Sequence, residues 1–510
     1  MIISGENLTV EDVLKVALEG EKVELSDDAA EKIKRSRQYV RKIVEKGEVI
    51  YGVTTGFGKL CNVVISPDDS RELQINLIRS HAVGVGDYLP EEVVRAMMLL
   101  RVNALAKGYS GVRLSTIMTL IEMLNKGVTP LVPCQGSLGA SGDLVPLAHM
   151  VLVMIGEGEA VYEGKRLPGG KALERAGIKP VVLEAKEGLA LINGTQAMSA
   201  VGSLALACAV NISKVADICG ALSFEALNGV IDALDEKVQA VRPHPGQVSC
   251  ARNMRKLLEG SEFVTRQGQL KVQDAYALRC LPQVHGAVKD AIKHVKKVME
   301  IEINSATDNP LIFPEEERVI SGGNFHGEPV AINMDYLSIA VSELANISER
   351  RIERLVNPHL NEGLPAFLTE KGGLNSGLMI SQYTAAALVS ENKTLSFPAS
   401  VDSIPSSANQ EDHVSMGTIA ARKALKIVEN TTNVLAIELL CAAQALDFRM
   451  EKNRSIKLGK GTDVTYKIVR DIVPKIVEDR VLSLDVKKLA NIIKSGELVR
   501  KIEGVIGELE

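Results

Sequence analysis

The chain has 510 residues, of which 46% are hydrophobic and 24% are charged, the balance of an ordinary globular protein. At about 150 residues per domain this length allows two to four domains, and so long a chain needs neither a metal ion nor disulfides to fold. The 59 basic and 64 acidic residues give a net charge of −5, and only 3% of the residues are aromatic. This charge, together with the absence of Trp, argues against a protein built to bind nucleic acid.

The seven cysteines stand singly, and none forms a C-x-x-C pair. An odd number of isolated thiols is typical of a reducing compartment. The first twenty residues carry acidic side chains early and lack the basic and apolar segments of a signal peptide. Two apolar runs, residues 197–210 and 434–445, are shorter than the roughly 20 residues that a bilayer requires. We therefore expect a cytoplasmic protein that does not bind membranes.

Most of the sequence is predicted to be helical. Thr9 followed by Asp12 is a capping box, and it predicts a helix over residues 10–18. Further along, the run SPDD supplies a cap, a first-turn proline and first-turn acids. This run predicts a helix over about residues 67–80 that ends near His81, because two glycines follow closely.

Later segments complete the predicted elements. A turn at Glu163 and Gly164 between short apolar arms predicts a small hairpin over residues 160–167. Either Ser141 or Asp143 is expected to cap the helix that follows them. The two apolar runs are interpreted as core helices that are buried on every side, in a bundle or an oligomer. The last 50 or so residues have the pattern of amphipathic surface helices.

The composition changes near residue 200, where Gly-rich mixed segments give way to longer helical ones. This change predicts two domains, residues 1–200 and residues 201–510, in a chain whose fold class is mainly α. Eight Gly-rich or polar clusters interrupt the predicted helices. They are YGVTTGFGKL (51–60), SHAVGVG (80–86), GSLGASGDL (136–144), NGTQAM (193–198), QDAYALRC (273–280), NSATDNP (304–310), SGGNFHGE (321–328) and SANQEDHVSM (407–416).

The common catalytic motifs do not fit these clusters. The first has five residues between its outer glycines where a phosphate-binding loop has four, and Leu60 replaces the Ser or Thr that follows the lysine of such a loop. Ser141 lacks the second flanking glycine of a nucleophile elbow. His326 and Glu328 are accompanied by no further Cys or His cluster, so no metal site is expected.

The tripeptide Ala140-Ser141-Gly142 offers a different chemistry. If the backbone bends tightly here, the amide nitrogen of Gly142 can attack the carbonyl carbon of Ala140 and close a five-membered ring. Loss of two waters, one of which carries away the Ser141 hydroxyl, leaves an exocyclic methylidene group. The nearby glycines permit the unusual backbone angles that this requires. The N-terminus of the following helix would favour negative charge that develops on the ring.

The segment GSLGASGDLVPLAHM resembles the signature of the aromatic amino acid ammonia-lyases, whose prosthetic group is 4-methylidene-imidazol-5-one (MIO). Six further clusters, YGVTTGFG, NGTQAM, QDAYALRC, NSATDNP, GGNFHGEP and SANQEDHVSM, match this family in its order, so the resemblance covers nearly the whole chain. It implies an N-terminal mixed α/β domain that carries the MIO and a C-terminal bundle of long helices, as in the fumarase/aspartase-like helical superfamily. It also implies a homotetramer whose active sites are shared between subunits, with no external cofactor and no metal.

The resemblance implies a carbon–nitrogen lyase that removes ammonia from an α-amino acid. Within the family the chain is most similar to bacterial members that act on histidine. Ser80-His81 stands where tyrosine-specific members have His-Leu and phenylalanine-specific members have Phe-Leu, and plant-type members lack the equivalent of Glu411. The expected reaction converts L-histidine to trans-urocanate and ammonia, the first step of histidine degradation to glutamate. His81 and Glu411 suit an imidazole ring, which offers one hydrogen-bond donor and one acceptor.

By the same resemblance, Ala140, Ser141 and Gly142 form the MIO, with Ser141 becoming its dehydroalanine. Tyr51 is the expected base, and such a phenol needs a positive environment. Catalytic roles are also implied for Tyr276, on the helix face of Arg279, and for Glu411 in proton transfer. The other implied contacts are a carboxylate clamp at Arg279, hydrogen bonds from Asn193 and Gln273 to the MIO oxygen and the substrate carboxylate, packing by Phe325 and a substrate contact by Gln410.

Two alternatives stay open at this point. The first is a tyrosine or phenylalanine ammonia-lyase or aminomutase of the same family. The second is a helical scaffold without catalytic activity, in which Ala140-Ser141-Gly142 never cyclises. The mass of the protein separates these, because a mature MIO makes each subunit lighter by two waters.

Overall fold

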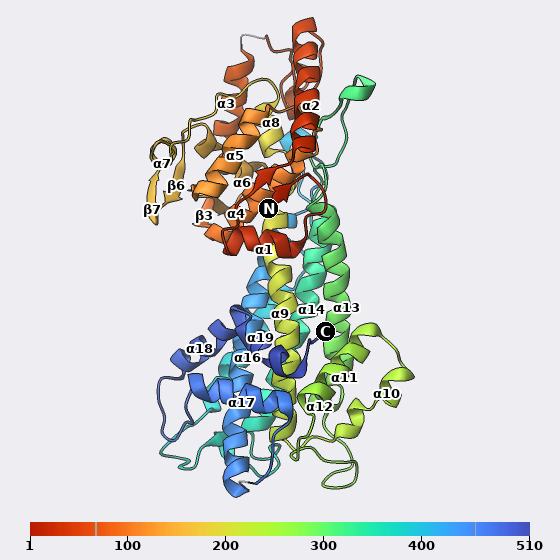
Figure 1. Ribbon diagram of the computed structural model, residues 1–510, viewed down its shortest axis with the longest axis vertical. Helices are drawn as coiled ribbons and strands as arrows, with labels where there is room; N and C mark the ends of the chain where they lie inside the picture. The colour runs from red at the N-terminus through yellow and green to blue at the C-terminus, as the bar shows by residue number, and fades with distance from the viewer. Residues whose placement is uncertain (67–68, 454) are drawn as a thin grey trace. The chain divides into compact units, whose positions relative to one another are not determined.

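A computed structural model describes residues 1–66, 69–453 and 455–510, and the chain divides into two compact units (Figure 1). The first unit comprises residues 1–207, 296–335 and 398–422, and the second comprises residues 208–295, 336–397 and 423–510. Helices predominate in both, and the sheets of the described residues have only two or three short strands each. The predicted mainly α fold is therefore confirmed, whereas the division into domains at residue 200 stays a prediction.

The first unit combines short helices with all the strands of the described chain. Its helices are α1 (Val10–Leu18), α2 (Asp27–Lys46), α3 (Ser70–His81), α4 (Glu91–Ala106), α5 (Leu114–Lys126), α6 (Leu144–Met154), α7 (Gly169–Arg175) and α8 (Glu187–Ile192). Its strands are β1 (Ile2–Ile3), β2 (Glu24–Leu25), β3 (Val85–Tyr88), β4 (Thr129–Pro130), β5 (Pro133–Gln135), β6 (Glu159–Tyr162), β7 (Lys165–Pro168), β8 (Leu311–Phe313) and β9 (Arg318–Ile320). The largest sheet has the antiparallel order β4-β6-β7, and β1 and β2 pair in parallel.

Long helices characterise the second unit. Four of them have residues in both units, namely α9 (Gln196–Ala226), α13 (Leu281–Glu302), α14 (Glu328–Val356) and α16 (Gly417–Lys452). The others are α10 (Glu236–Ala240), α11 (Pro245–Leu257), α12 (Tyr276–Arg279), α15 (Met379–Leu395), α17 (Lys460–Ile472), α18 (Leu482–Lys494) and α19 (Glu497–Ile506). Figure 1 shows the second-unit parts of α9, α13, α14 and α16 running alongside one another as a bundle. The amphipathic helices predicted for the last 50 residues are α17, α18 and α19.

Local sequence signals are confirmed where the interactions are local. At α1 the Thr9 hydroxyl accepts from the Asp12 backbone N–H at 3.2 Å, and the Asp12 carboxylate accepts from the Thr9 N–H at 3.2 Å. The predicted hairpin is formed by β6 and β7, with a left-handed turn at Glu163 and Gly164. Helix α3 ends at His81 as expected, and its N-cap is Asp69. The proline and first aspartate of the SPDD run, Pro67 and Asp68, lie outside the described residues.

The N-cap expected for α6 is confirmed in position but not in hydrogen bonding. Asp143 occupies the N-cap position, but its side chain makes no capping hydrogen bond. The buried carboxylate instead accepts from the Ser137 hydroxyl at 2.8 Å, from the Met198 backbone N–H at 2.7 Å and from the Thr418 hydroxyl. Partners distant in the sequence therefore compete successfully with the local cap, and Asp143 ties the tripeptide loop to the starts of α9 and α16.

The two apolar runs are core helices, as predicted. Among the described residues, α9 is the one helix that is long and apolar enough to cross a membrane, but 72% of its most apolar window is buried inside the protein. Such burial is typical of a core helix. In α16 the run over residues 434–445 is also buried throughout. A helix that is buried on every side has apolar residues all around it, which accounts for the composition of these two runs.

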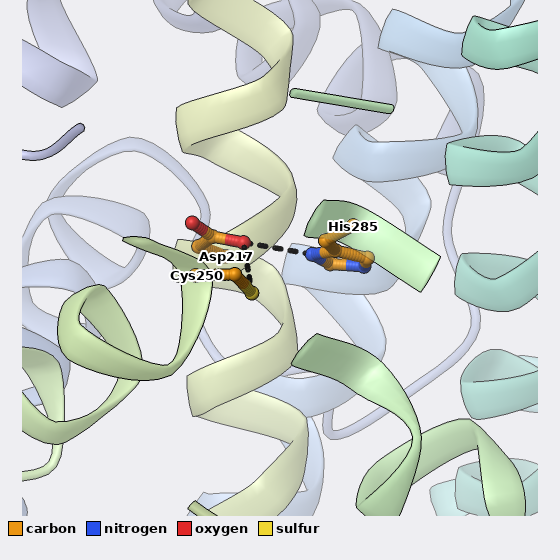
Figure 2. Close-up of side chains that lie close together, drawn as sticks. All are labelled: Asp217, Cys250 and His285. Atoms are coloured by element: carbon orange, nitrogen blue, oxygen red, sulfur yellow. Dashed lines mark hydrogen bonds and ion pairs between the residues drawn. The ribbon is translucent and has the colours of Figure 1, made fainter. Parts of the chain in front are cut away.

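A buried polar cluster links three helices of the second unit (Figure 2). The Asp217 carboxylate on α9 accepts from His285 Nδ1 at 2.8 Å and from the Cys250 thiol at 3.1 Å. It also contacts the side-chain amide of Asn253 at 2.9 Å and the ammonium group of Lys289 at 3.1 Å. The three residues of Figure 2 have the types that bind metal ions. A metal ion here would have to displace this set of hydrogen bonds and would face the Lys289 charge.

Candidate active site

A cavity of about 1040 Å³ in the first unit collects residues from seven separate segments of the chain. Eight of the predicted site residues line it, namely Tyr51, His81, Ala140, Ser141, Asn193, Phe325, Gln410 and Glu411. Gly142, the third residue of the tripeptide, is buried beside them. The folded chain therefore brings together most of the side chains that the sequence singled out.

The tripeptide lies on a tightly bent loop before α6. Gly139 and Gly142 have φ values of 66° and 73°, in the left-handed region that favours glycine. A Cβ atom on Gly142 would lie 2.2 Å from the carbonyl oxygen of Gly194, so no larger residue fits there. The same Gly194 oxygen accepts from the backbone N–H of Asp143 at 2.7 Å. The loop and the segment around Gly194 are thus held in direct backbone contact.

Ser141 is held on two sides. The side-chain amide of Asn193, at the end of α8, donates to the Ser141 carbonyl oxygen at 2.8 Å. The Ser141 hydroxyl donates to the Glu411 carboxylate at 3.0 Å, whose second oxygen accepts from the Ser406 hydroxyl at 3.2 Å. Asn193 is almost fully buried, with 3% of its surface exposed. Its amide is consequently fixed on one oxygen atom.

This arrangement fits the ring that the tripeptide is expected to form. Ring closure requires a tight bend and a residue without a side chain at the attacking nitrogen, and Gly142 satisfies both requirements. The Ser141 carbonyl, which would become the carbonyl of the ring, already has an amide donor in Asn193. The departing Ser141 hydroxyl lies against a carboxylate that can exchange protons with it.

Tyr51 lies in the turn before the short helix Gly58–Leu60, and its hydroxyl accepts from the Gly58 backbone N–H at 3.3 Å. Burial raises the pKa of the Tyr51 phenol, and the negative charges of Glu411 and Asp308 raise it further. The phenol is therefore protonated at neutral pH in the isolated chain. A role as base requires an additional positive charge in the cavity.

His81 is the last residue of α3 and lines the same cavity as Ser141. Its Nδ1 atom lies 3.1 Å from the hydroxyl of Ser80. Burial lowers the pKa of the His81 imidazole, which is neutral at pH 7 for that reason. A neutral imidazole can donate one hydrogen bond and accept another, as a substrate imidazole would require.

Three predicted site residues belong to the second unit and do not line this cavity: Gln273, Tyr276 and Arg279. They lie on or just before α12, where the Arg279 guanidinium stacks over the Tyr276 ring at 4.5 Å. Arg279 Nε also donates to the Asp274 carbonyl oxygen at 2.9 Å. Tyr276 and Arg279 therefore share a helix face as expected, and 70% of Tyr276 is exposed. Their role in the site stays a prediction.

The cavity also includes residues to which the sequence analysis gave no role. His326 and His413 line it with their rings 5.6 Å apart, and Asn309 contributes to another part of the wall. His326 Nδ1 accepts from the Glu328 N–H at 3.3 Å, and its Nε2 lies 3.3 Å from the His413 carbonyl oxygen. The residues His326, Glu328 and His413 could hold a metal ion only if these hydrogen bonds were exchanged for metal bonds. His326, His413 and Asn309 each belong to one of the polar clusters of the sequence, and this was the only feature by which the sequence could have indicated a place in the site.

Comparison with known proteins identifies the family. The chain belongs to the aromatic amino acid lyase family, whose model matches residues 8–471. It is similar to the histidine ammonia-lyase of Caldanaerobacter subterraneus subsp. tengcongensis, with 64% identity over 510 residues that cover 100% of this chain and 99% of that protein. The family resemblance drawn from the sequence is thereby confirmed.

Solved structures agree with this assignment. The crystal structure of histidine ammonia-lyase from Trypanosoma cruzi has a TM-score of 0.91 and 45% identity, covering 99% of this chain and 95% of that one. Tyrosine aminomutase from Streptomyces globisporus has a TM-score of 0.96 and 40% identity, with both chains fully covered. Members with different substrates thus share the fold, so the residues of the cavity have to decide the substrate.

Proposed function

We propose that this protein is a histidine ammonia-lyase, which converts L-histidine to trans-urocanate and ammonia as the first step of histidine degradation to glutamate. The observation that carries this proposal is that His81 and Glu411 line one cavity with Ala140 and Ser141. The 64% identity to a histidine ammonia-lyase over the full chain supports the same substrate. Its seven cysteines, which stand singly in the sequence without a C-x-x-C pair, fit a cytoplasmic enzyme.

The specificity follows from the chemistry of an imidazole. A phenyl ring needs only apolar contacts, whereas an imidazole has one donor and one acceptor that must be paired when buried. Neutral His81 and the Glu411 carboxylate can satisfy both atoms. Sites built for such hydrogen bonds discriminate strongly against substrates that lack them, because their own polar groups would be left unpaired.

The MIO that we infer from Ala140, Ser141 and Gly142 supplies, once formed, the electrophile that binds the substrate amine. The residues of this chain perform the supporting steps. The Asn193 amide stabilises negative charge on the Ser141 carbonyl oxygen, to which it already donates. Glu411 contacts the Ser141 hydroxyl before this group leaves as water, and its carboxylate can then exchange a proton with the substrate beside the ring.

Tyr51 is the proposed base that removes the β-proton of histidine. Burial and nearby carboxylates raise the pKa of its phenol, so a cation must offset them before the phenol ionises. We propose that two cations do this: the ammonium group of the substrate and the guanidinium group of Arg279 of the partner subunit. Binding of substrate and activation of the base are coupled in this way.

We further propose that the working enzyme is a homotetramer in which the second unit of one subunit completes the cavity of another. Support comes from the cavity lining, which is formed by first-unit residues and does not include the second-unit residues Gln273, Tyr276 and Arg279. The planar guanidinium of Arg279 can bind the substrate carboxylate through two parallel hydrogen bonds. The exposed stack of Arg279 and Tyr276 is then available to a second copy.

Substitution of His81 tests the substrate assignment against the tyrosine and phenylalanine alternatives. His81→Leu removes a hydrogen-bonding partner of the imidazole, and we expect kcat/KM for histidine to fall about 10²-fold or more. The matched control is His359→Leu, which changes an exposed histidine in the second unit. Turnover is followed as ammonia released from histidine, tyrosine and phenylalanine. A His81→Leu variant with undiminished histidine turnover would contradict the proposal.

A further inference from the structure

Arg101 is a fully buried cation in the middle of α4, a helix whose neighbouring residues are almost all apolar. Its side chain is not part of the cavity lining. The guanidinium donates to the Asn193 carbonyl oxygen at 2.8 Å, to the Gln196 side-chain oxygen at 2.6 Å and to the Ala190 carbonyl oxygen. All three acceptors belong to one segment, which runs from the end of α8 to the start of α9. Arg101 therefore fixes this segment from behind.

The opposite side of the same segment contacts the tripeptide. Asn193 donates through its side chain to the Ser141 carbonyl oxygen, and Gly194 accepts from the Asp143 N–H. Gly194 also lies against Arg101, because a Cβ atom there would be 2.5 Å from Arg101 NH1. A single layer of backbone thus separates the guanidinium from the loop that carries Ala140, Ser141 and Gly142.

The charge of Arg101 has no carboxylate of its own. Lys186 and Asp308 form a fully buried ion pair at 2.7 Å nearby, whereas no carboxylate in the described part of the chain makes an ion pair with Arg101. Burial lowers the pKa of Arg101 to about 10, so the guanidinium remains charged at neutral pH. Asp308 attracts this charge without a direct ion pair, and the guanidinium itself contacts the Asn193 carbonyl oxygen in a region from which water is excluded.

We propose that Arg101 is a positioning residue for the formation and the reactivity of the MIO, an inference that rests on the proposed function. Arg101 holds the Asn193 backbone so that the side-chain amide meets the Ser141 carbonyl oxygen, and its charge stabilises the negative charge that this oxygen gains. Three directed hydrogen bonds from one rigid planar group perform this role, which a flexible ammonium could fill only in part.

The covalent steps of ring formation show at which step Arg101 would act. The bond that forms joins Gly142 N to the carbonyl carbon of Ala140, whose oxygen leaves as water with the amide hydrogens of Ser141 and Gly142. A second water takes the Ser141 hydroxyl together with the hydrogen on its Cα atom. Loss of the Cα proton places negative charge on the Ser141 carbonyl oxygen, the atom that Asn193 binds. Arg101 gives and takes no proton in either step.

The test compares Arg101→Gln, Arg101→Lys and Arg95→Gln with the unchanged protein. Arg95 is the matched control, because it lies on the same helix and also donates to backbone carbonyls, those of Val16 and Leu124, but contacts none of the segments around the cavity. The intact mass of each purified protein is followed over time after synthesis. Circular dichroism and the melting temperature report whether each variant is folded.

We expect the loss of two waters to be complete in the unchanged protein and in Arg95→Gln. In folded Arg101→Gln it should be at least about tenfold slower, and kcat should fall about 10²-fold with KM changed less than about twofold. Arg101→Lys should be intermediate, since it restores the charge but not the three directed bonds. This ordering of the mass measurements is a readout that a purely structural role would not produce.

Folded Arg101 variants that lose both waters at the rate of the unchanged protein would overturn the inference. If Arg101→Gln does not fold, Arg101→Lys decides, and full-rate water loss in that variant would again overturn it. Failure of the proposed function has a different signature: the unchanged protein would then keep both waters, or would lose them but release ammonia from tyrosine or phenylalanine and not from histidine.

Discussion

At the scale of single residues, the cavity combines groups that are held before any substrate arrives. Ser141 is bound at its carbonyl oxygen by Asn193 and at its hydroxyl by Glu411. Because these contacts use buried or half-buried atoms, they are little weakened by competition with water. The tripeptide is thus oriented by hydrogen bonds that are already made, which is the condition for electrostatic stabilisation at low reorganisation cost.

Tyr51 provides the prediction at this scale. The Tyr51→Phe variant should still lose two waters, since the hydrogen bond of the phenol is to the Gly58 backbone N–H, but its kcat should fall about 10³-fold through loss of the base. In the unchanged protein the raised pKa of the phenol means that the active, ionised form increases as pH rises. The kcat/KM for histidine should therefore climb with pH on the alkaline side of neutrality, and this rise should vanish in Tyr51→Phe. Equal pH profiles for both proteins would exclude Tyr51 as the base.

At the scale of elements, the sequence predicted correctly those features that depend on residues close together in the chain, and missed those that depend on distant residues. The capping box of α1 and the β6–β7 hairpin involve residues close together in the chain, and both are confirmed. At α6 the N-cap Asp143 makes no capping hydrogen bond, because its carboxylate accepts from residues more than 50 positions away. No local sequence signal pointed to Arg101, because its acceptors lie between the end of α8 and the start of α9 and only the fold brings them close.

The residues of the site divide in the same way, into those that the sequence could identify and those that only the fold brings together. Motif resemblance identified Asn193 and Glu411, and the cavity contains both. The predicted boundary at residue 200 already separated Gln273, Tyr276 and Arg279 from the tripeptide, but sequence spacing could not tell whether they line the same cavity, because that depends on tertiary contacts. His326 and His413 stand 87 positions apart, and their proximity likewise follows from the fold.

Glu225 on α9 gives the prediction at the element scale. Burial raises the pKa of its carboxyl to about 7, although one oxygen accepts from the Gly459 N–H at the start of α17. Because the pKa in the folded protein lies above the unfolded value, the charged carboxylate destabilises the native state. This loss of folding free energy grows between about pH 4.5 and 7 and is complete above pH 7. Glu225→Gln should raise the free energy of unfolding at pH 8 by up to about 3 kcal/mol.

Denaturant unfolding at several pH values checks this expectation. The gain from Glu225→Gln should disappear below about pH 4.5, where the glutamic acid of the unchanged protein is neutral in both states. A suitable control is Glu236→Gln, since Glu236 is exposed and its pair with Arg255 contributes little. A stabilisation that is the same at every pH would contradict the assigned cause.

At the scale of the whole molecule, the proposed sharing of active sites predicts complementation. Tyr51→Phe and Arg279→Ala each remove one half of a site, and each variant alone should be nearly inactive. When the two are co-expressed, mixed tetramers contain sites with an intact Tyr51 from one subunit and an intact Arg279 from another. Random assembly should restore about a quarter of the full activity. Mixtures no more active than the separate variants would rule out sharing of these two residues.

The central claim is that Ala140, Ser141 and Gly142 form the electrophile of a histidine ammonia-lyase. Its most direct test is the intact mass of the unchanged protein, with fragmentation of the peptide that contains residues 140–142. We expect a mass lower by two waters per subunit, with the whole deficit confined to that peptide and absent from Ser141→Ala. A chain of full mass, or a deficit located elsewhere, would contradict it.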